Sequence, residues 1–152
     1  MVGIEFVRSL FLLAIIAQQG VTNPAIGFTA TLSHQHSLSA RQTIVYDKVV
    51  TNYGNGYDKW TGHFKAPIDG LYVFSCAAMA HASHHIHIEI VKNGKMVSRV
   101  FSSDSPYDLG TQTVVLALRR GYQVWARQEQ DGRHLQGSYN QFSGYLISTE
   151  IY

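Results

Sequence analysis

The sequence predicts an all-β protein, built as a sandwich of short strands. Helical periodicity is almost absent from the 152 residues. Short runs rich in β-branched and aromatic residues alternate instead with clusters of Gly, Asn, Asp and Ser, a pattern typical of strands separated by tight turns. One pair of runs is joined by Asn93-Gly94, a dipeptide that favours a two-residue hairpin. These observations indicate a single β domain.

The first residues have the composition of a secretory signal peptide. Arg8 and the amino terminus provide positive charge, and an apolar run follows at residues 10–17. This run is shorter than the roughly 20 residues that a membrane-spanning helix needs, and it suits a signal peptide. We expect a signal peptide over residues 1–17, with cleavage after Ala17 or Gly20, and a secreted protein. An amphipathic helix and a retained anchor are the alternatives.

The first half of the remaining chain contains three candidate strands. Residues 27–32 form a short alternating run, and residues 44–50 form a second one that ends at a turn-rich segment, residues 52–56. Pro67 and Gly70 bracket a corner before a longer run over residues 71–80. Because Pro and Gly interrupt strands, they predict where the chain turns.

The most secure hairpin lies in the second half. Ile86, Ile88 and Ile90 alternate with polar residues, and a second run covers residues 96–101. Asn93-Gly94 between them favours positive φ angles at both central positions of a turn. We therefore expect two paired strands with one face toward the core.

The run over residues 111–118 is apolar on both faces. Val114, Leu116 and Leu118 occupy one face, and Val115 and Ala117 occupy the other. A strand covered on both sides has this composition, whereas a lone sandwich buries one face only. The second apolar face therefore indicates subunit packing. Strands at 122–128 and 142–151 complete the expected set.

Composition and motifs narrow the function classes. The formal net charge is +2, and Lys and Arg are scattered singly, which argues against nucleic acid as the main partner. The chain contains no HExxH, GxSxG, Walker loop or GxGxxG motif, so we expect no enzymatic activity. Cys76 is the single cysteine. It shares a strand face with Phe74, so we expect a buried thiol; an intermolecular disulfide is the alternative.

Aromatic, amide and glycine residues recur at fixed offsets in the middle of the chain: Tyr46, Asn52, Tyr57, Phe64, Gly70, Tyr72 and Phe74. Further motifs follow at Lys92-Asn93-Gly94, Gln123-Val124-Trp125 and residues 142–147. In this spacing the chain over residues 25–152 resembles the globular domain of the complement C1q family. Two positions depart from the family pattern, since Tyr46 stands for the usual Phe and Cys76 for the usual Phe or Tyr.

The resemblance implies a ten-strand jelly roll, shared with tumour-necrosis-factor-like ligands, that forms a tight homotrimer. It also implies that Tyr57 and Trp125 pack in the core. No collagen-like Gly-X-Y run occurs in the chain. Stalkless secreted members resemble innate-immune lectins, so we expect a pattern-recognition protein that binds microbial polysaccharide or lipopolysaccharide multivalently. The alternative is a trimeric extracellular signalling or matrix-assembly ligand that binds a protein receptor.

Candidate ligand-binding residues lie beside Gly- and Asp-rich segments. Tyr53, Trp60 and Tyr107 could stack on sugar rings if they are exposed. Arg133 and His134 could contact anionic groups, because a guanidinium binds phosphate or carboxylate with two parallel hydrogen bonds. The competing interpretation is that all five are ordinary solvated side chains.

Calcium is the metal that the resemblance suggests. Asp104 and Asp108 supply hard oxygen donors in one loop, and Asp108 lies near the position of a family calcium ligand. Many members carry an Asp after the glycine at position 121, whereas this chain has Tyr122. That departure favours the alternative, solvated turn aspartates.

Histidine is unusually frequent, with a cluster at residues 81–87. His85 and His87 would share one strand face about 6.6 to 6.8 Å apart, a spacing that suits two ligands of one metal ion. Glu89 is the near candidate for a third ligand. Exposed polar histidines and a pH-responsive surface are the alternatives.

Overall fold

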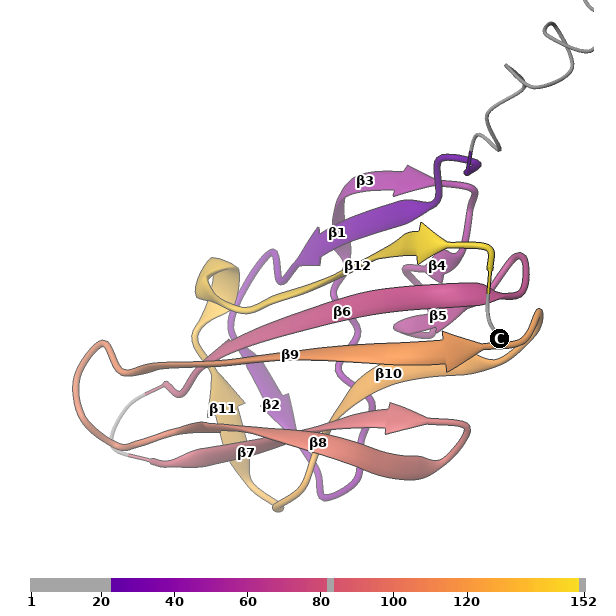
Figure 1. Ribbon diagram of the computed structural model, residues 1–152. Helices are drawn as coiled ribbons and strands as arrows, with labels where there is room; N and C mark the ends of the chain where they lie inside the picture. Colours follow the sequence, from indigo (N-terminus) through magenta and orange to yellow (C-terminus); the bar gives the residue numbers. More distant parts are fainter. Residues whose placement is uncertain (1–22, 82–83, 151–152) are drawn as a thin grey trace, which may run out of the picture.

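The computed structural model describes residues 23–81 and 84–150, so the expected signal peptide lies outside the described residues. The chain forms two antiparallel five-stranded sheets that stack face to face, together with a two-stranded ribbon (Figure 1). The all-β jelly-roll prediction is confirmed, and the ten strands of the two large sheets match the expected number. No helix in the described ranges is long and apolar enough to cross a membrane.

The first large sheet, called sheet I below, has the strand order β3-β1-β12-β6-β9. Its strands are β1 (Gly27–Thr31), β3 (Lys48–Tyr53), β6 (Gly70–Met79), β9 (Leu109–Leu118) and β12 (Gln141–Ser148). β6 pairs along its length with both β12 and β9. The long alternating run after the Pro67 corner therefore forms a strand inside the sheet, as predicted.

The second large sheet, sheet II, has the order β4-β5-β10-β7-β8. Its strands are β4 (Tyr57–Asp58), β5 (His63–Lys65), β7 (Ile86–Lys92), β8 (Lys95–Ser102) and β10 (Gln123–Gln128). β2 (His36–Leu38) and β11 (Arg133–Leu135) form the ribbon, and a 3-10 turn at Gly137–Tyr139 follows. Asn93 and Gly94 have φ angles of 47° and 86°, which confirms the predicted hairpin turn between β7 and β8.

The edges of the two sheets meet where β8 lies beside β9. A Cβ atom added at Gly110 would lie 1.9 Å from the carbonyl oxygen of Phe101, so only glycine fits at this position. Nearby, Gln112 Nε2 donates a hydrogen bond of 2.9 Å to Ser98 Oγ. The two edge strands therefore cover each other along one side of the sandwich.

Aromatic rings fill the centre of the sandwich. Phe74 is fully buried, and its ring centroid lies 5.3 Å from that of Phe64 and 6.0 Å from that of Phe142. A Cβ atom at Gly144 would lie 2.5 Å from Phe74 Cδ1. The glycine of the closing motif is therefore needed because the Phe74 ring lies directly against the backbone of β12.

The two positions that depart from the family pattern contact each other. Cys76 is 1% exposed, and its sulfur lies 3.6 Å from the hydroxyl of Tyr46. Tyr brings a hydroxyl that Phe lacks, and the small Cys side chain leaves room for it. Burial raises the pKa of the Cys76 thiol to about 11. The prediction of a buried cysteine is confirmed, and in this packing an intermolecular disulfide would require the core to open.

The strand predicted over residues 44–50 was partly wrong. Residues 44–47 run beside sheet II, where the Ile44 N–H donates to the carbonyl of Ala126 at 2.9 Å, and the chain then crosses to sheet I at β3. Because alternation continues through the crossing, the sequence pattern did not reveal it. The following turn is centred on Gly54-Asn55, with φ angles of 75° and 51°.

Candidate functional site

The outer face of sheet I, which points away from the sandwich, carries exposed apolar side chains. The strand registers place Val115, Val73, Tyr145, Gly27 and Tyr53 in one row across the sheet. Val115 is 56% exposed and Tyr145 is 58% exposed. Leu109 and Ile147 are also exposed on this sheet. This surface, called the apolar face below, is the kind of patch that marks an interaction site.

The apolar face agrees with the two-sided pattern predicted for residues 111–118. Val114 and Leu116 pack against the core, whereas Val115 and Ala117 are exposed on the opposite side. Tyr53, which we predicted to be a loop residue for ligand binding, instead ends strand β3 and belongs to the same row. The pattern missed this because it placed the turn at residues 52–56.

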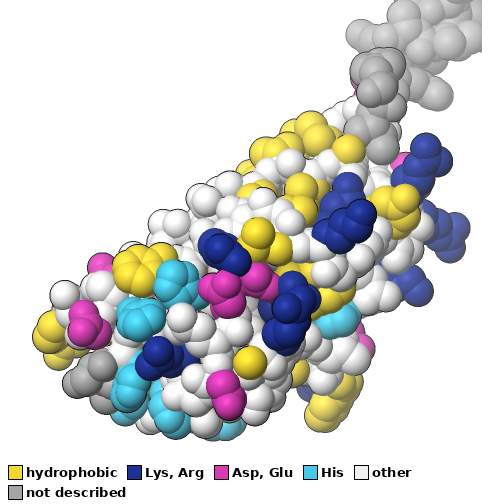
Figure 2. Space-filling view, turned by 90° about the horizontal axis from the view of Figure 1, so that it is seen from below, with side chains coloured by type: hydrophobic (Ala, Val, Ile, Leu, Met, Phe, Trp, Pro, Cys, Tyr) yellow, Lys and Arg dark blue, Asp and Glu magenta, His cyan; other side chains and the backbone are white. Residues whose placement is uncertain are grey.

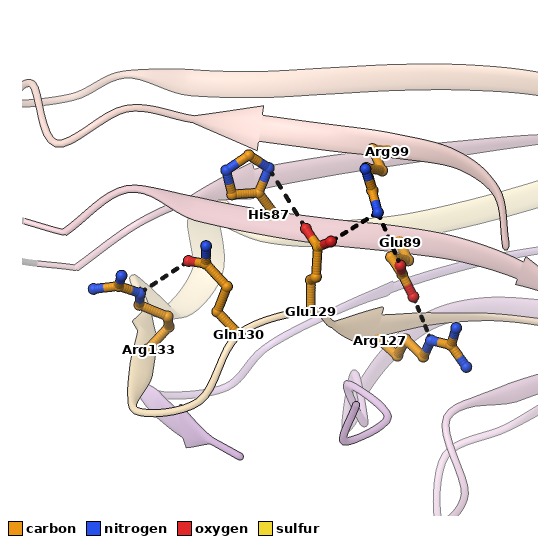
Figure 3. A network of polar contacts seen from close by, with 7 residues as sticks. All are labelled: His87, Glu89, Arg99, Arg127, Glu129, Gln130 and Arg133. Carbon is orange, nitrogen blue, oxygen red and sulfur yellow. Dashed lines mark hydrogen bonds and ion pairs between the residues drawn. The ribbon is translucent and has the colours of Figure 1, made fainter. Parts of the chain in front are cut away.

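Sheet II carries an ion-pair network on its outer face (Figure 3). The registers place Glu89 of β7 between Arg99 of β8 and Arg127 of β10. Arg127 Nε donates to Glu89 Oε2 at 2.5 Å, and both side chains are almost fully buried. Arg99 Nη2 lies 3.6 Å from Glu89 Oε1 and 2.7 Å from Glu129 Oε1. Cross-strand pairing thus holds one carboxylate between two guanidinium groups.

The histidine pair surrounds an exposed aromatic ring. The ring centroids of His85 and His87 are 5.6 Å apart, and the centroid of Phe101 lies 4.9 Å from that of His87. Phe101 is 52% exposed. Together with Arg99, two residues earlier on the same side of β8, it forms what we call the flank patch. Phe101 was not identified from the sequence, although its position opposite His87 in the predicted hairpin could have indicated it.

The predicted third metal ligand is engaged elsewhere. Glu89 pairs with Arg127, and His87 Nδ1 lies 3.7 Å from a different carboxylate, that of Glu129. Within the described ranges no group of three or more His, Cys, Asp or Glu side chains could hold a metal ion. Binding by His85 and His87 remains a prediction that would need further ligands.

A polar pocket lies at the end of the molecule formed by the β8–β9 loop. Its volume is about 530 Å³. The lining residues are Met79, Ala80, His81, His84, Ser103, Asp104, Ser105, Pro106, Tyr107, Gln136 and Tyr139. Tyr107 is 84% exposed and has a φ angle of 62°, an unusual conformation for an aromatic residue. We call this hollow the end pocket.

The two candidate calcium ligands have different surroundings. Asp104 lines the end pocket, whereas Asp108 does not. The Asp108 carboxylate accepts a hydrogen bond of 2.5 Å from the N–H of Ser103, and this bond lowers its pKa. Asp108 therefore helps to shape the loop, and Asp104 is the carboxylate that a pocket ligand would meet.

The remaining predicted residues lie on separate surfaces. Trp60, 80% exposed, sits between β4 and β5 beside a shallow hollow, with Lys59 Nζ 4.9 Å from its ring centroid. Arg133 and His134 lie in β11, where Arg133 Nε donates to Gln130 Oε1 at 3.2 Å. Trp60 lines the hollow beside β4 and Tyr107 lines the end pocket, so these two predicted residues belong to different hollows.

Trp125 corrects another expectation. We predicted a core residue, but Trp125 is half-buried on the outer face of sheet II. Its ring stacks on His63 with centroids 4.3 Å apart, and His63 Nδ1 lies 2.8 Å from Gln123 Oε1. The resemblance to the family did not distinguish a half-covered position on the outer face from one in the interior.

Comparison with known proteins gives consistent matches. The family model of the C1q domain matches residues 27–147. Complement C1q tumor necrosis factor-related protein 3 from Mus musculus is 31% identical over 128 residues, which cover 80% of this chain and 51% of that protein. The human related protein 2 is 29% identical over 134 residues, covering 84% of this chain and 46% of that protein. The chain thus spans about half the length of these relatives.

Solved structures share the fold at low identity. The globular domain of zebrafish complement 1qA superposes with a TM-score of 0.68 at 16% identity, covering 80% of this chain and 97% of that one. Eiger TNF from S. frugiperda superposes with a TM-score of 0.71 at 14% identity, covering 86% and 97%. Murine APRIL superposes with a TM-score of 0.66 at 12% identity, covering 81% and 99%.

Proposed function

This chain belongs to the C1q-domain family, and we propose that it is a secreted, non-catalytic ligand that acts as a homotrimer and binds a protein receptor. The names of its relatives, which join C1q to tumor necrosis factor, support a ligand role over a catalytic one. The observation that carries the proposal is the apolar face of sheet I. A single sandwich buries only the inner faces of its sheets, so this outer apolar surface would stay in water unless another subunit covered it.

Three copies would bury the apolar face around a three-fold axis. Closed cyclic symmetry covers the same patch on every subunit and leaves no free copy of it. Val115 and Tyr145 lie in the central row of this face and are more than half exposed in the single chain. Burying such side chains removes apolar area from water, which favours association.

Val115→Glu is expected to convert the trimer into a monomer at micromolar concentration, because each interface would bury an unpaired charge. Light scattering coupled to size exclusion measures the mass directly. Phe101→Glu is the matched control: Phe101 is similarly exposed but lies on sheet II, so this variant should stay trimeric. A wild-type protein that is monomeric at that concentration would contradict the proposal.

The flank patch is the surface that we propose for the receptor. Protein interfaces concentrate their binding energy in aromatic and Arg side chains. Phe101 supplies an exposed aromatic ring, and the ion pair with Glu129 orients the Arg99 guanidinium beside it. The patch belongs to sheet II, so it would remain accessible while sheet I forms the trimer.

Recognition of microbial glycans is the second candidate function, and the end pocket supports it. Tyr107 offers an exposed ring for stacking, and Asp104 offers a carboxylate for sugar hydroxyls or for calcium. Three such pockets on one trimer would gain avidity for a repetitive polysaccharide or lipopolysaccharide surface even if each site is weak.

The variants Phe101→Ala and Tyr107→Ala separate the two functions. For a receptor ligand, Phe101→Ala is expected to weaken saturable binding to protease-sensitive cell-surface sites by roughly 30-fold, the loss typical of a hot-spot residue. Tyr107→Ala should leave that binding unchanged.

The complementary assay uses bacterial polysaccharides and lipopolysaccharide, with calcium or with chelator and with free sugars as competitors. Sugar-competed binding that Tyr107→Ala abolishes and Phe101→Ala preserves would favour glycan recognition instead.

A further inference from the structure

Cations are concentrated at the end of the molecule opposite the end pocket. Three turns meet there: Gly121 N–H donates to the Ala66 carbonyl at 2.8 Å, and Asn93 N–H donates to the Gln123 carbonyl at 2.9 Å. These turns carry Lys65, Lys92, Lys95, Arg119 and Arg120, which we call the basic end. Figure 2 shows Lys and Arg side chains gathering toward one end and His side chains toward the other.

Most cations of the basic end have no acidic partner among the described residues. The structure pairs Arg99 and Arg127 with carboxylates, but it records no ion pair or side-chain hydrogen bond for Lys65, Lys95, Arg119 or Arg120. Lys92 Nζ donates a hydrogen bond of 2.9 Å to the Ala117 carbonyl. Asp69 accepts the backbone N–H of Arg120 at 2.7 Å, and Glu150 follows the end of β12 nearby. Asp58 lines a neighbouring hollow together with Lys65, so three carboxylates lie near five cations and this end stays positive.

The basic end contains an open cleft of about 560 Å³. Lys65 and Arg120 both line it, together with Gly54, Asn55, Ala66, Pro67 and Gly121. No Phe, Tyr or Trp lines the cleft, so it lacks the aromatic side chains that proteins place at a lipid interface. Two cationic side chains, Lys65 and Arg120, therefore line a hollow whose other residues are uncharged.

We propose that the basic end binds a sulfated polysaccharide, with one sulfate seated in the cleft between Lys65 and Arg120. A guanidinium matches the oxygens of such an anion with two parallel hydrogen bonds. A single small anion would need only the two cleft cations. The other three, on neighbouring turns, match a linear polyanion that passes over the rim. The site is separate from the flank patch and does not require a receptor.

Heparin binding at 0.15 M NaCl tests the proposal on the full secreted chain. The triple variant Lys65→Gln, Arg119→Gln, Arg120→Gln is expected to weaken binding roughly 100-fold, about fivefold for each cation removed at an anionic surface. The matched control is Lys48→Gln, Arg41→Gln, Lys59→Gln, which changes the net charge equally but leaves the basic end intact. It should change the affinity by less than about threefold.

Four results would overturn the proposal. The first is a wild-type protein that does not bind heparin at this salt concentration. The second is an equal loss in the two triple variants, which would show general charge attraction. The third is binding to phosphatidylserine vesicles without binding to heparin, which would assign the basic end to membranes. Hyaluronan, which carries carboxylates but no sulfates, should bind at least about tenfold more weakly than heparin, and equal binding would contradict a sulfate-specific cleft.

Discussion

Phe74→Ala is expected to lower the free energy of unfolding by about 3–5 kcal/mol, as is usual when a fully buried phenylalanine is truncated. The Phe74 ring contacts Phe64 and Phe142, and it lies against the backbone at Gly144. The surrounding rings belong to strands of both sheets, so they cannot close the cavity without moving the sheets. Lost transfer energy and an unfilled cavity therefore both contribute to the cost.

Urea unfolding at fixed protein concentration measures this effect, since association would otherwise shift the midpoint. Phe101→Ala is the control, because that ring is half exposed and its removal should cost less than about 1 kcal/mol. Equal destabilisation by the two substitutions would contradict the description of Phe74 as the centre of the core.

Glu89→Leu is expected to lower the free energy of unfolding by about as much as Phe74→Ala. Replacing both members of the Glu89–Arg127 ion pair is expected to lower it much less. Glu89→Leu leaves the Arg127 guanidinium almost buried without its carboxylate, which costs about 3–5 kcal/mol. In the double variant Glu89→Leu, Arg127→Met, apolar groups replace both charges, and we expect most of that stability to return. Arg99→Gln should cost at most about 1 kcal/mol, because the Arg99 side chain is 49% exposed.

A double-mutant cycle by urea unfolding decides the point. The expectation would be wrong if the double variant were less stable than Glu89→Leu. In that case the ion pair would stabilise the fold by more than the cost of burying its two charges.

The fold could be predicted because its signals are local. Asn93-Gly94 specifies a hairpin turn by its φ angles alone, and the two-sided run in β9 reflects burial on one side and exposed apolar residues on the other. The crossing before β3 was missed because alternation describes which face a residue occupies and not which sheet it joins. Ile44 points inward whichever sheet its backbone contacts.

The candidate sites were harder to predict, because they depend on which loops meet in space. Tyr53 and Trp60 are close in sequence, yet one joins the apolar face and the other borders a separate hollow. Asp104 and Asp108 share a loop but only Asp104 lines the end pocket. The basic end could not be recognised from single scattered cations, because three turns distant in sequence bring them together.

The contact of β8 with β9 has a consequence for solubility. An uncovered strand edge can pair with another chain, and such pairing begins aggregation. Here the edges of both large sheets close on each other at Gly110, so in the described residues the large sheets keep open edges at β3 and at the two-residue strand β4. A short edge offers few unpaired groups to a neighbouring molecule. Closing β8 against β9 therefore removes two of the four edges of the large sheets at which intermolecular sheets could begin.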